Sequence, residues 1–105
     1  MEIKFDKEYL RELFENGKAT EKKYRFQPQI ISKYQKTVVL LRSLSQEEDL
    51  YRYNGLNYEA LHGDKEGLGS VRINDQYRIE LKTTKIVTQT VVTICTFIEL
   101  SNHYK

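Results

Sequence analysis

Few side chains in this 105-residue chain are of the types that usually carry out chemistry. The only histidines are His62, at the start of the glycine-rich stretch GDKEGLG, and His103, two residues from the end of the sequence. A histidine can hold or release a proton near neutral pH, which suits a general acid or base. Loop and terminal histidines are more often simply solvated, so the sequence leaves both interpretations open.

The other candidates are polar residues that alternate with apolar ones in SVRINDQYRIELK, residues 70–82. The apolar set is Val71, Ile73, Tyr77, Ile79 and Leu81. The polar set is Arg72, Asn74, Arg78, Glu80 and Lys82. Because side chains alternate across a strand, we expect the polar set on an open sheet face, opposite the core. Its arginines could bind phosphate through their forked donors, or simply form cross-strand ion pairs.

Familiar enzyme signatures are missing from the sequence, which has no HExxH, Walker loop, GxSxG, paired-histidine spacing or clustered carboxylates. Cys95 is the only cysteine, so neither an intramolecular disulfide nor a cysteine-based zinc site can form within the sequence. In a strand it is expected to be a small core residue. We therefore expect no metal and no cofactor.

The composition, with 39% hydrophobic and 30% charged residues, five glycines and one proline, is that of an ordinary folded chain. Its length suits one domain, residues 1–105. The net charge of +2 permits nucleic-acid binding without selecting it. Because no signal-peptide apolar region opens the sequence and its apolar runs fall short of the roughly 18 residues of a membrane span, we expect a cytoplasmic protein without membrane association.

The first half of the sequence predicts a short strand, EIKF, and then helices. Asp6 is placed to cap a first helix that Gly17 ends, and Pro28 suits the first turn of a second. Apolar residues at helical spacing are Leu10, Leu13 and Phe14 in the first helix, and Ile31, Tyr34, Val38, Leu41 and Leu44 in the second. SQEE, residues 45–48, has the pattern of a capping box for a short third helix that ends near Arg52.

From residue 69 the period changes to two, which is typical of strands. Two half-buried strands meet at NDQ, and the largely apolar TVVTICTFIEL predicts a central third strand. We therefore predict an α+β fold: a short N-terminal strand, a helical hairpin and an antiparallel three-stranded meander, with the helices on one sheet face.

The run LHGDKEGLGSVRINDQYRIEL, residues 61–81, resembles the HigB-type killer proteins of the RelE/ParE toxin superfamily. Its most specific part is GDKEG followed by SVRINDQYRI, between an upstream YNGLNYEA and a terminal IELSNHYK. The resemblance covers most of the chain and implies a RelE/ParE-like fold. It also implies the toxin of a bacterial type II toxin–antitoxin pair, a ribosome-dependent endoribonuclease that cuts mRNA in the decoding site. A helix-turn-helix, HigA-like antitoxin would silence it and provide its only link to operator DNA.

Metal-free cleavage by the ribose 2′-hydroxyl needs a proton acceptor, positive charge on the phosphate and a proton donor for the departing oxygen. Arg78 and Arg72 are our candidates for stabilising the phosphate, and His103 for the acid or base. Lys65, Asn74 and Lys82 are candidate RNA contacts, and Tyr104 is a candidate platform for a base.

The sequence departs from the family pattern at two places. Members often end in Asp-Tyr-His, whereas the matching positions here are Ser101, Asn102 and His103. Members also commonly carry a lysine before the GD of the loop, where this chain has His62. We therefore include His62 in the catalytic set, as a cation or a second proton-transfer group.

The one basic stretch, residues 18–36, carries six lysines and arginines against a single acid. Lys22 and Lys23 are its candidates for docking on ribosomal RNA, because lysines contact phosphate without reading sequence. An ordinary solvated helix face is an equally good interpretation. Two other functions also remain open: a ParE-like poison of DNA gyrase, and a non-catalytic module whose polar sheet face binds the antitoxin.

Overall fold

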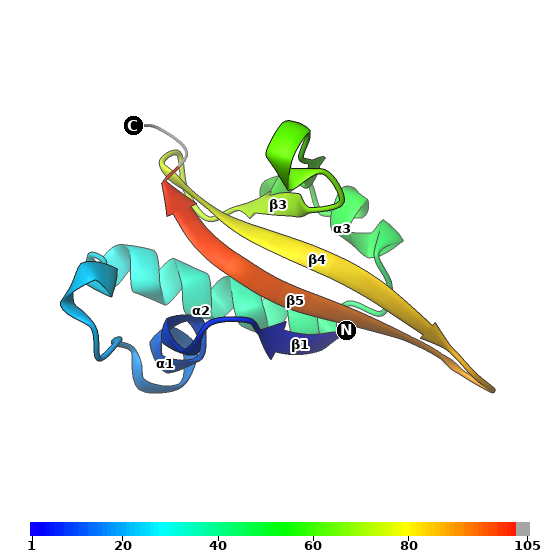
Figure 1. The fold of residues 1–105 in the computed structure, drawn as a ribbon, viewed down its shortest axis with the longest axis horizontal. Helices are drawn as coiled ribbons and strands as arrows, with labels where there is room; N and C mark the ends of the chain where they lie inside the picture. Colours follow the sequence, from blue (N-terminus) through cyan, green and yellow to red (C-terminus); the bar gives the residue numbers. More distant parts are fainter. Residues whose placement is uncertain (103–105) are drawn as a thin grey trace.

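The computed structural model describes residues 1–102, in which a five-stranded sheet carries the helices on one face (Figure 1). The strands are β1 (Glu2–Phe5), β2 (Glu59–Ala60), β3 (Gly69–Arg72), β4 (Tyr77–Val87) and β5 (Val91–Asn102), in the order β1-β5-β4-β3-β2. The predicted α+β class and the β3-β4-β5 meander are confirmed. Strand β1 joins the meander as a parallel partner of β5, and the short β2 extends it at the other edge.

The helices are α1 (Glu8–Asn16), α2 (Pro28–Ser43) and α3 (Glu48–Arg52). Single 3₁₀ turns follow at η1 (Lys22–Tyr24), η2 (Asn54–Leu56) and η3 (Gly63–Lys65). Gly17 ends α1 in the left-handed conformation, with φ of 74°, and Pro28 opens α2, both as predicted. Among residues 1–102 no helix is both long enough and apolar enough to cross a bilayer.

Both predicted N-terminal caps are wrong, because other groups satisfy the backbone there. Helix α1 begins after Lys7, and the backbone N–H of Asp6 donates to the carbonyl of Phe97 at 2.9 Å, which extends the sheet pairing. In the SQEE stretch the carboxylate of Asp49 accepts the backbone N–H groups of Ser45, at 3.0 Å, and Gln46, at 3.2 Å. The side chain of Asp49 thus satisfies backbone N–H groups at the start of the helix, as a capping box was expected to do.

The core lies between the sheet and the pair α1–α2. Its fully buried side chains include Leu10 and Leu13 of α1, Tyr34, Val38 and Leu41 of α2, and Val71, Ile79, Leu81 and Phe97 of the sheet. The hydroxyl of Tyr34 donates to the carbonyl of Leu10 at 2.7 Å, so the buried phenol is satisfied. Burial raises the pKa of the Cys95 thiol to about 12, which keeps it protonated as a core residue.

The β4–β5 hairpin extends beyond its neighbouring strands (Figure 1). Strand β3 pairs with β4 only as far as Leu81, and β1 pairs with β5 only over residues 94–97. The tip carries exposed apolar side chains, namely Ile86, Val87, Val91 and Val92. The chemistry-bearing residues of β3 and β4 lie at the opposite, broader end of the sheet.

Candidate functional site on the open sheet face

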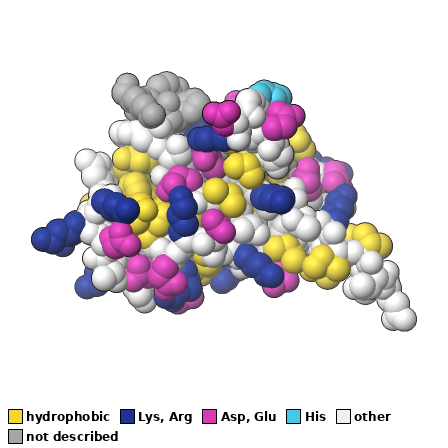
Figure 2. Space-filling view, in the orientation of Figure 1, with side chains coloured by type: hydrophobic (Ala, Val, Ile, Leu, Met, Phe, Trp, Pro, Cys, Tyr) yellow, Lys and Arg dark blue, Asp and Glu magenta, His cyan; other side chains and the backbone are white. Residues whose placement is uncertain are grey.

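The sheet face away from α1 and α2 carries the predicted polar set. Figure 2 shows basic and acidic side chains interleaved on this side of the molecule, where β4 and β5 lie in front of α2. Arg72 of β3 lies directly opposite Arg78 of β4, and Arg78 lies opposite Ser101 of β5. Two guanidinium groups thus occupy neighbouring strands near the end of β5.

Arg78 is held by several hydrogen bonds. Its Nε donates to the hydroxyl oxygen of Ser70 at 2.8 Å, and its Nη2 donates to the carbonyls of Ser70, at 3.2 Å, and Asn57. Ser70 is buried, so Arg78 satisfies polar atoms that water does not reach. These bonds fix the direction of the guanidinium group and use only two of its three nitrogens.

Arg72 and Asn74 take part in the β3–β4 turn. Nη2 of Arg72 forms an ion pair with Oδ1 of Asp75, whose side chain is exposed. Oδ1 of Asn74 accepts the backbone N–H groups of Gln76, at 2.9 Å, and Tyr77, at 2.7 Å. Asn74 therefore stabilises the turn through its side-chain oxygen.

Lys65 brings a cation from η3 onto the same face. Its Nζ lies 2.5 Å from Oε2 of Glu80 on β4. Glu80 was expected to be exposed, but it is buried, with 9% of its surface accessible, because the loop that carries Lys65 packs over it. The charge of Lys65 is therefore matched by a buried carboxylate. Lys82, further along β4, is exposed and has no ion pair within residues 1–102.

His62 lies outside this cluster of arginines. It lines a cleft of about 410 Å³ together with Tyr51, Tyr58 and Glu66, and its Nδ1 is 3.7 Å from Oε2 of Glu66. An acid, Glu66, thus lies beside its ring. His103 and Tyr104 lie outside the described residues.

Lys22 and Lys23 lie on η1, in the connection between α1 and α2. Nζ of Lys23 is 3.6 Å from Oε2 of Glu21 and 5.1 Å from the ring centroid of Tyr24. Among residues 1–102 the predicted site residues thus lie in three places: the open sheet face, this connection, and the separate cleft that holds His62.

Sequence reasoning missed the residues that hold the arginine in place. Ser70 lies two residues before Arg72 in the same strand, so alternation predicts that both side chains lie on the open face. Asn57 comes from a turn that no period predicts, and it contributes a backbone carbonyl rather than a side chain. Among residues 1–102 no three His, Cys, Asp or Glu side chains gather as a metal site requires.

The fold belongs to the α+β class. It has a five-stranded sheet, a parallel N-terminal edge strand and two helices packed on one face. A solved structure that is similar to this chain is the YoeB/ParE toxin from Agrobacterium tumefaciens. The TM-score is 0.57 at 18% sequence identity, and the match covers 99% of this chain and 100% of that chain. No protein-family model and no curated protein matches the sequence. The predicted RelE/ParE-like fold is confirmed, whereas membership of the toxin superfamily and of its HigB-type subgroup stays a prediction.

Proposed function

We propose that this protein is the toxin of a bacterial type II toxin–antitoxin pair and cuts mRNA as a ribosome-dependent, metal-independent endoribonuclease. The observation that carries the proposal is the arginine pair on the open face of a fold that is similar, over its whole length, to a YoeB/ParE toxin. The HigB-type resemblance of residues 61–81 supports the nuclease branch.

Arg72 and Arg78 are proposed to bind the scissile phosphate. Like charges directly opposite on neighbouring strands repel, and an anion between them relieves that repulsion. Asp75 and Ser70 orient the two guanidinium groups, and Nη1 of Arg78 has no partner within residues 1–102. This free nitrogen can donate to a phosphate oxygen as negative charge builds up in the transition state.

Proton transfer is assigned to His103, with His62 as the second candidate. Strand β5 pairs Ser101 with Arg78, and Asn102, the last described residue, directly precedes His103 in the sequence. Imidazole can remove the proton of the 2′-hydroxyl or supply one to the departing 5′-oxygen. Lys65, Asn74, Lys82 and Tyr104 are proposed as further RNA contacts.

The proposed partners are the ribosome with its mRNA and a HigA-like antitoxin, which would also make the only link to operator DNA. The cytoplasm is the proposed location because ribosomes and mRNA are there. Inhibition by the antitoxin would follow if it covers the open face and so excludes RNA from Arg72 and Arg78.

The second candidate is a gyrase poison, because the matched structure carries the name ParE beside YoeB. The two functions leave different damage in a cell. DNA breaks with intact messages indicate the gyrase poison, whereas cut messages with intact DNA indicate the nuclease. A folded protein that does not arrest growth would leave only the non-catalytic antitoxin-binding module.

The test is cleavage of a defined mRNA, on programmed ribosomes and free in solution, by the native protein and by His103→Ala and Arg72→Ala. We expect cleavage only on ribosomes, and loss of at least about tenfold in each variant. Arg52→Ala is the matched control, because Arg52 is an exposed arginine of α3 with one surface ion pair. If the folded native protein does not cleave the mRNA, the nuclease proposal is overturned.

A pH–rate profile tests the histidines separately. If a neutral imidazole is the base, the rate rises through the histidine range; if an imidazolium is the acid, the rate falls with increasing pH. A profile that is flat from about pH 6 to 8 would remove both His62 and His103 from proton transfer.

A further inference from the structure

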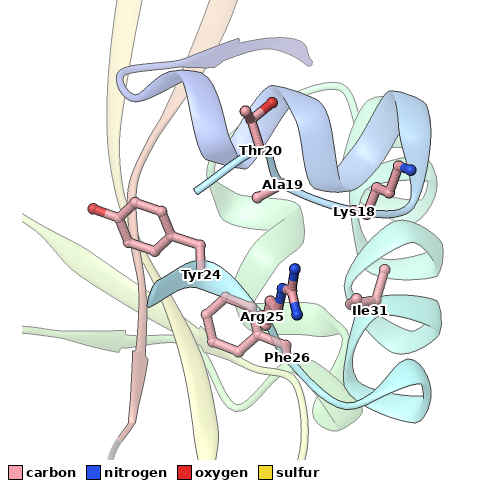
Figure 3. Close-up of a pocket in the computed structure, with 7 residues that line it drawn as sticks. All are labelled: Lys18, Ala19, Thr20, Tyr24, Arg25, Phe26 and Ile31. Atoms are coloured by element: carbon pink, nitrogen blue, oxygen red, sulfur yellow. The ribbon is translucent and has the colours of Figure 1, made fainter. Parts of the chain in front are cut away.

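A pocket of about 490 Å³ lies between the α1–α2 connection and the first turn of α2 (Figure 3). Its lining combines two cations, Lys18 and Arg25, with the rings of Tyr24 and Phe26 and the aliphatic side chain of Ile31. Figure 3 shows the side chains of Arg25, Phe26 and Ile31 gathered around a common space. The volume falls in the range of roughly 300–1,000 Å³ that is usual for small-molecule sites.

Two cations, Lys18 and Arg25, give the lining of the pocket its positive charge. Neither Lys18 nor Arg25 has an ion pair within residues 1–102, and both are exposed. Two acids lie beside this stretch: Glu12 accepts hydrogen bonds from Thr20, which lines the pocket, and Glu21 lies beside Lys23. The hydrogen bonds from Thr20 lower the pKa of Glu12, which therefore stays ionised and bound to Thr20. The cations of the pocket are left to face solvent.

Three contacts, two from α1 and one from β4, hold the walls of the pocket in place. The hydroxyl of Thr20 donates to Oε2 of Glu12 at 2.5 Å. The ring of Tyr24 stacks on Tyr9 of α1, with centroids 3.7 Å apart. The ring of Phe26 packs edge-on against Tyr77 of β4, with centroids 5.5 Å apart. A site whose walls are already held loses less conformational entropy when a ligand binds.

We propose that this pocket binds one nucleotide of single-stranded RNA, with the base against Phe26 and Ile31 and its phosphate on Lys18 and Arg25. The inference rests on the proposed function, for which it supplies a second RNA contact away from the open face. Stacking of a base on an aromatic ring beside cations is the usual way in which single strands are held.

The surroundings favour RNA over an acidic peptide as the ligand. Lys22 and Lys23 precede Tyr24 on η1, so the positive charge continues along the chain beyond the pocket. A polyanion uses such a track at every phosphate, and each neutralised phosphate adds to the salt dependence of binding. A peptide that carries one carboxylate would use only the pocket itself.

The experiment measures binding of the full chain to a fluorescein-labelled 2′-O-methyl oligoadenylate hexamer by fluorescence anisotropy. The 2′-O-methyl group removes the nucleophile, so binding is measured whether or not the protein is a nuclease. The variants are Arg25→Gln, Lys18→Gln and Phe26→Leu, which keeps an apolar side chain against Tyr77 but removes the stacking ring. Arg52→Gln is the control, since Arg52 is an exposed arginine on the distant α3.

We expect each pocket variant to weaken binding about five- to tenfold, as loss of a stacked base or a phosphate contact does, and Arg52→Gln to change it less than about twofold. Arg25→Gln should also reduce the slope of log K against log salt by about one. Equal weakening by Arg52→Gln and Arg25→Gln would show non-specific attraction and overturn the pocket. Displacement of the hexamer by an acidic phenylalanine peptide, at concentrations where inorganic phosphate has no effect, would show a peptide site and also overturn it.

Failure of this inference is distinguishable from failure of the proposed function. A protein that cuts mRNA on ribosomes but binds the hexamer equally well in all variants would retain the function and lose the pocket. A protein that binds the hexamer through Arg25 and Phe26 but cuts no message would retain the pocket and lose the nuclease.

Discussion

Two regions of this molecule are rich in cations, and they use them in opposite ways. On the open face of β3 and β4, Arg78 is bonded to Ser70 and Asn57, and Lys65 is paired with the buried Glu80. On the α1–α2 connection, Lys18 and Arg25 are exposed and unpaired within residues 1–102.

This difference shows that the effect of replacing a cation depends on whether it has a buried partner. Where the partner is buried, removal of the cation leaves a polar group without water or a bond, and folding stability falls. Where there is no partner, removal changes only the charge that a ligand meets. We therefore expect substitutions on the open face to change both stability and activity, and those on the connection to change binding alone.

The largest effect is expected for Arg78→Ala. It leaves the hydroxyl of Ser70 and the carbonyl of Asn57 without their donor, so the free energy of unfolding should fall by about 1.5–3 kcal/mol. Urea denaturation measures this, with Arg52→Ala as the surface control, which should stay within about 0.5 kcal/mol of the native protein. An equal, small effect for both arginines would show that Arg78 is not a structural clamp.

Lys65→Met should have the next largest effect. It removes the partner of a buried carboxylate, but Lys65 is itself half-exposed, so we expect a loss of about 1–2 kcal/mol in the free energy of unfolding. The double variant Lys65→Met/Glu80→Gln removes the buried charge as well and should recover part of the loss. If the double variant is less stable than the single one by the full cost of Glu80→Gln alone, the two residues are not coupled.

Tyr9 links the last strand, β5, to the pocket, so Tyr9→Phe tests whether RNA binding depends on the hydrogen bonds of its hydroxyl. Its hydroxyl donates to Glu99 and accepts the backbone N–H of Leu100 at 3.0 Å, while its ring stacks on Tyr24 beside the pocket. Loss of the hydroxyl should reduce the free energy of unfolding by about 1 kcal/mol. The ring and its stacking remain, so binding of the RNA hexamer should change less than about twofold.

The same variant gives a pH prediction with a definite sign. Burial, with the bond to Glu99 added, raises the pKa of Tyr9 above the usual range of tyrosine. The folded state therefore keeps a proton that the unfolded chain loses, and stability falls as the pH rises above about 10. Urea midpoints at increasing alkaline pH should fall less steeply for Tyr9→Phe than for the native protein; an identical slope would show that Tyr9 does not contribute.

The parts of the fold that follow from local patterns could be predicted from the sequence. Alternation over residues 71–82 placed Arg72 and Arg78 on one face, because the strand period is fixed by backbone geometry. Gly17 and Pro28 marked helix ends for conformational reasons that belong to those residues alone. The parallel pairing of β1 with β5 joins segments some ninety residues apart in the sequence, and no local period encodes it.

The site was predicted less completely, because side-chain partners come from tertiary packing. The burial of Glu80 depends on a loop that folds over it, and the position of Arg78 depends on a carbonyl of Asn57. The pocket needs Tyr9 and Tyr77 to hold its walls, and both lie outside the basic stretch that drew attention to the region. The sequence identified the cations of that stretch, but it did not identify Tyr9 and Tyr77 as the rings that hold the pocket walls.

The smallest effect on stability and the sharpest on docking is expected for the double charge reversal Lys22→Glu/Lys23→Glu. Both lysines are exposed on η1, and Lys23 has only surface contacts, with Glu21 and the ring of Tyr24, so the free energy of unfolding should change by less than about 0.5 kcal/mol. Co-sedimentation with ribosomes should nevertheless fall and should become less dependent on salt, because two phosphate contacts are lost. The control Arg52→Glu/Lys85→Glu makes the same change in net charge around α3. If it releases the protein from ribosomes equally, net charge rather than a docking surface on the α1–α2 connection controls the association.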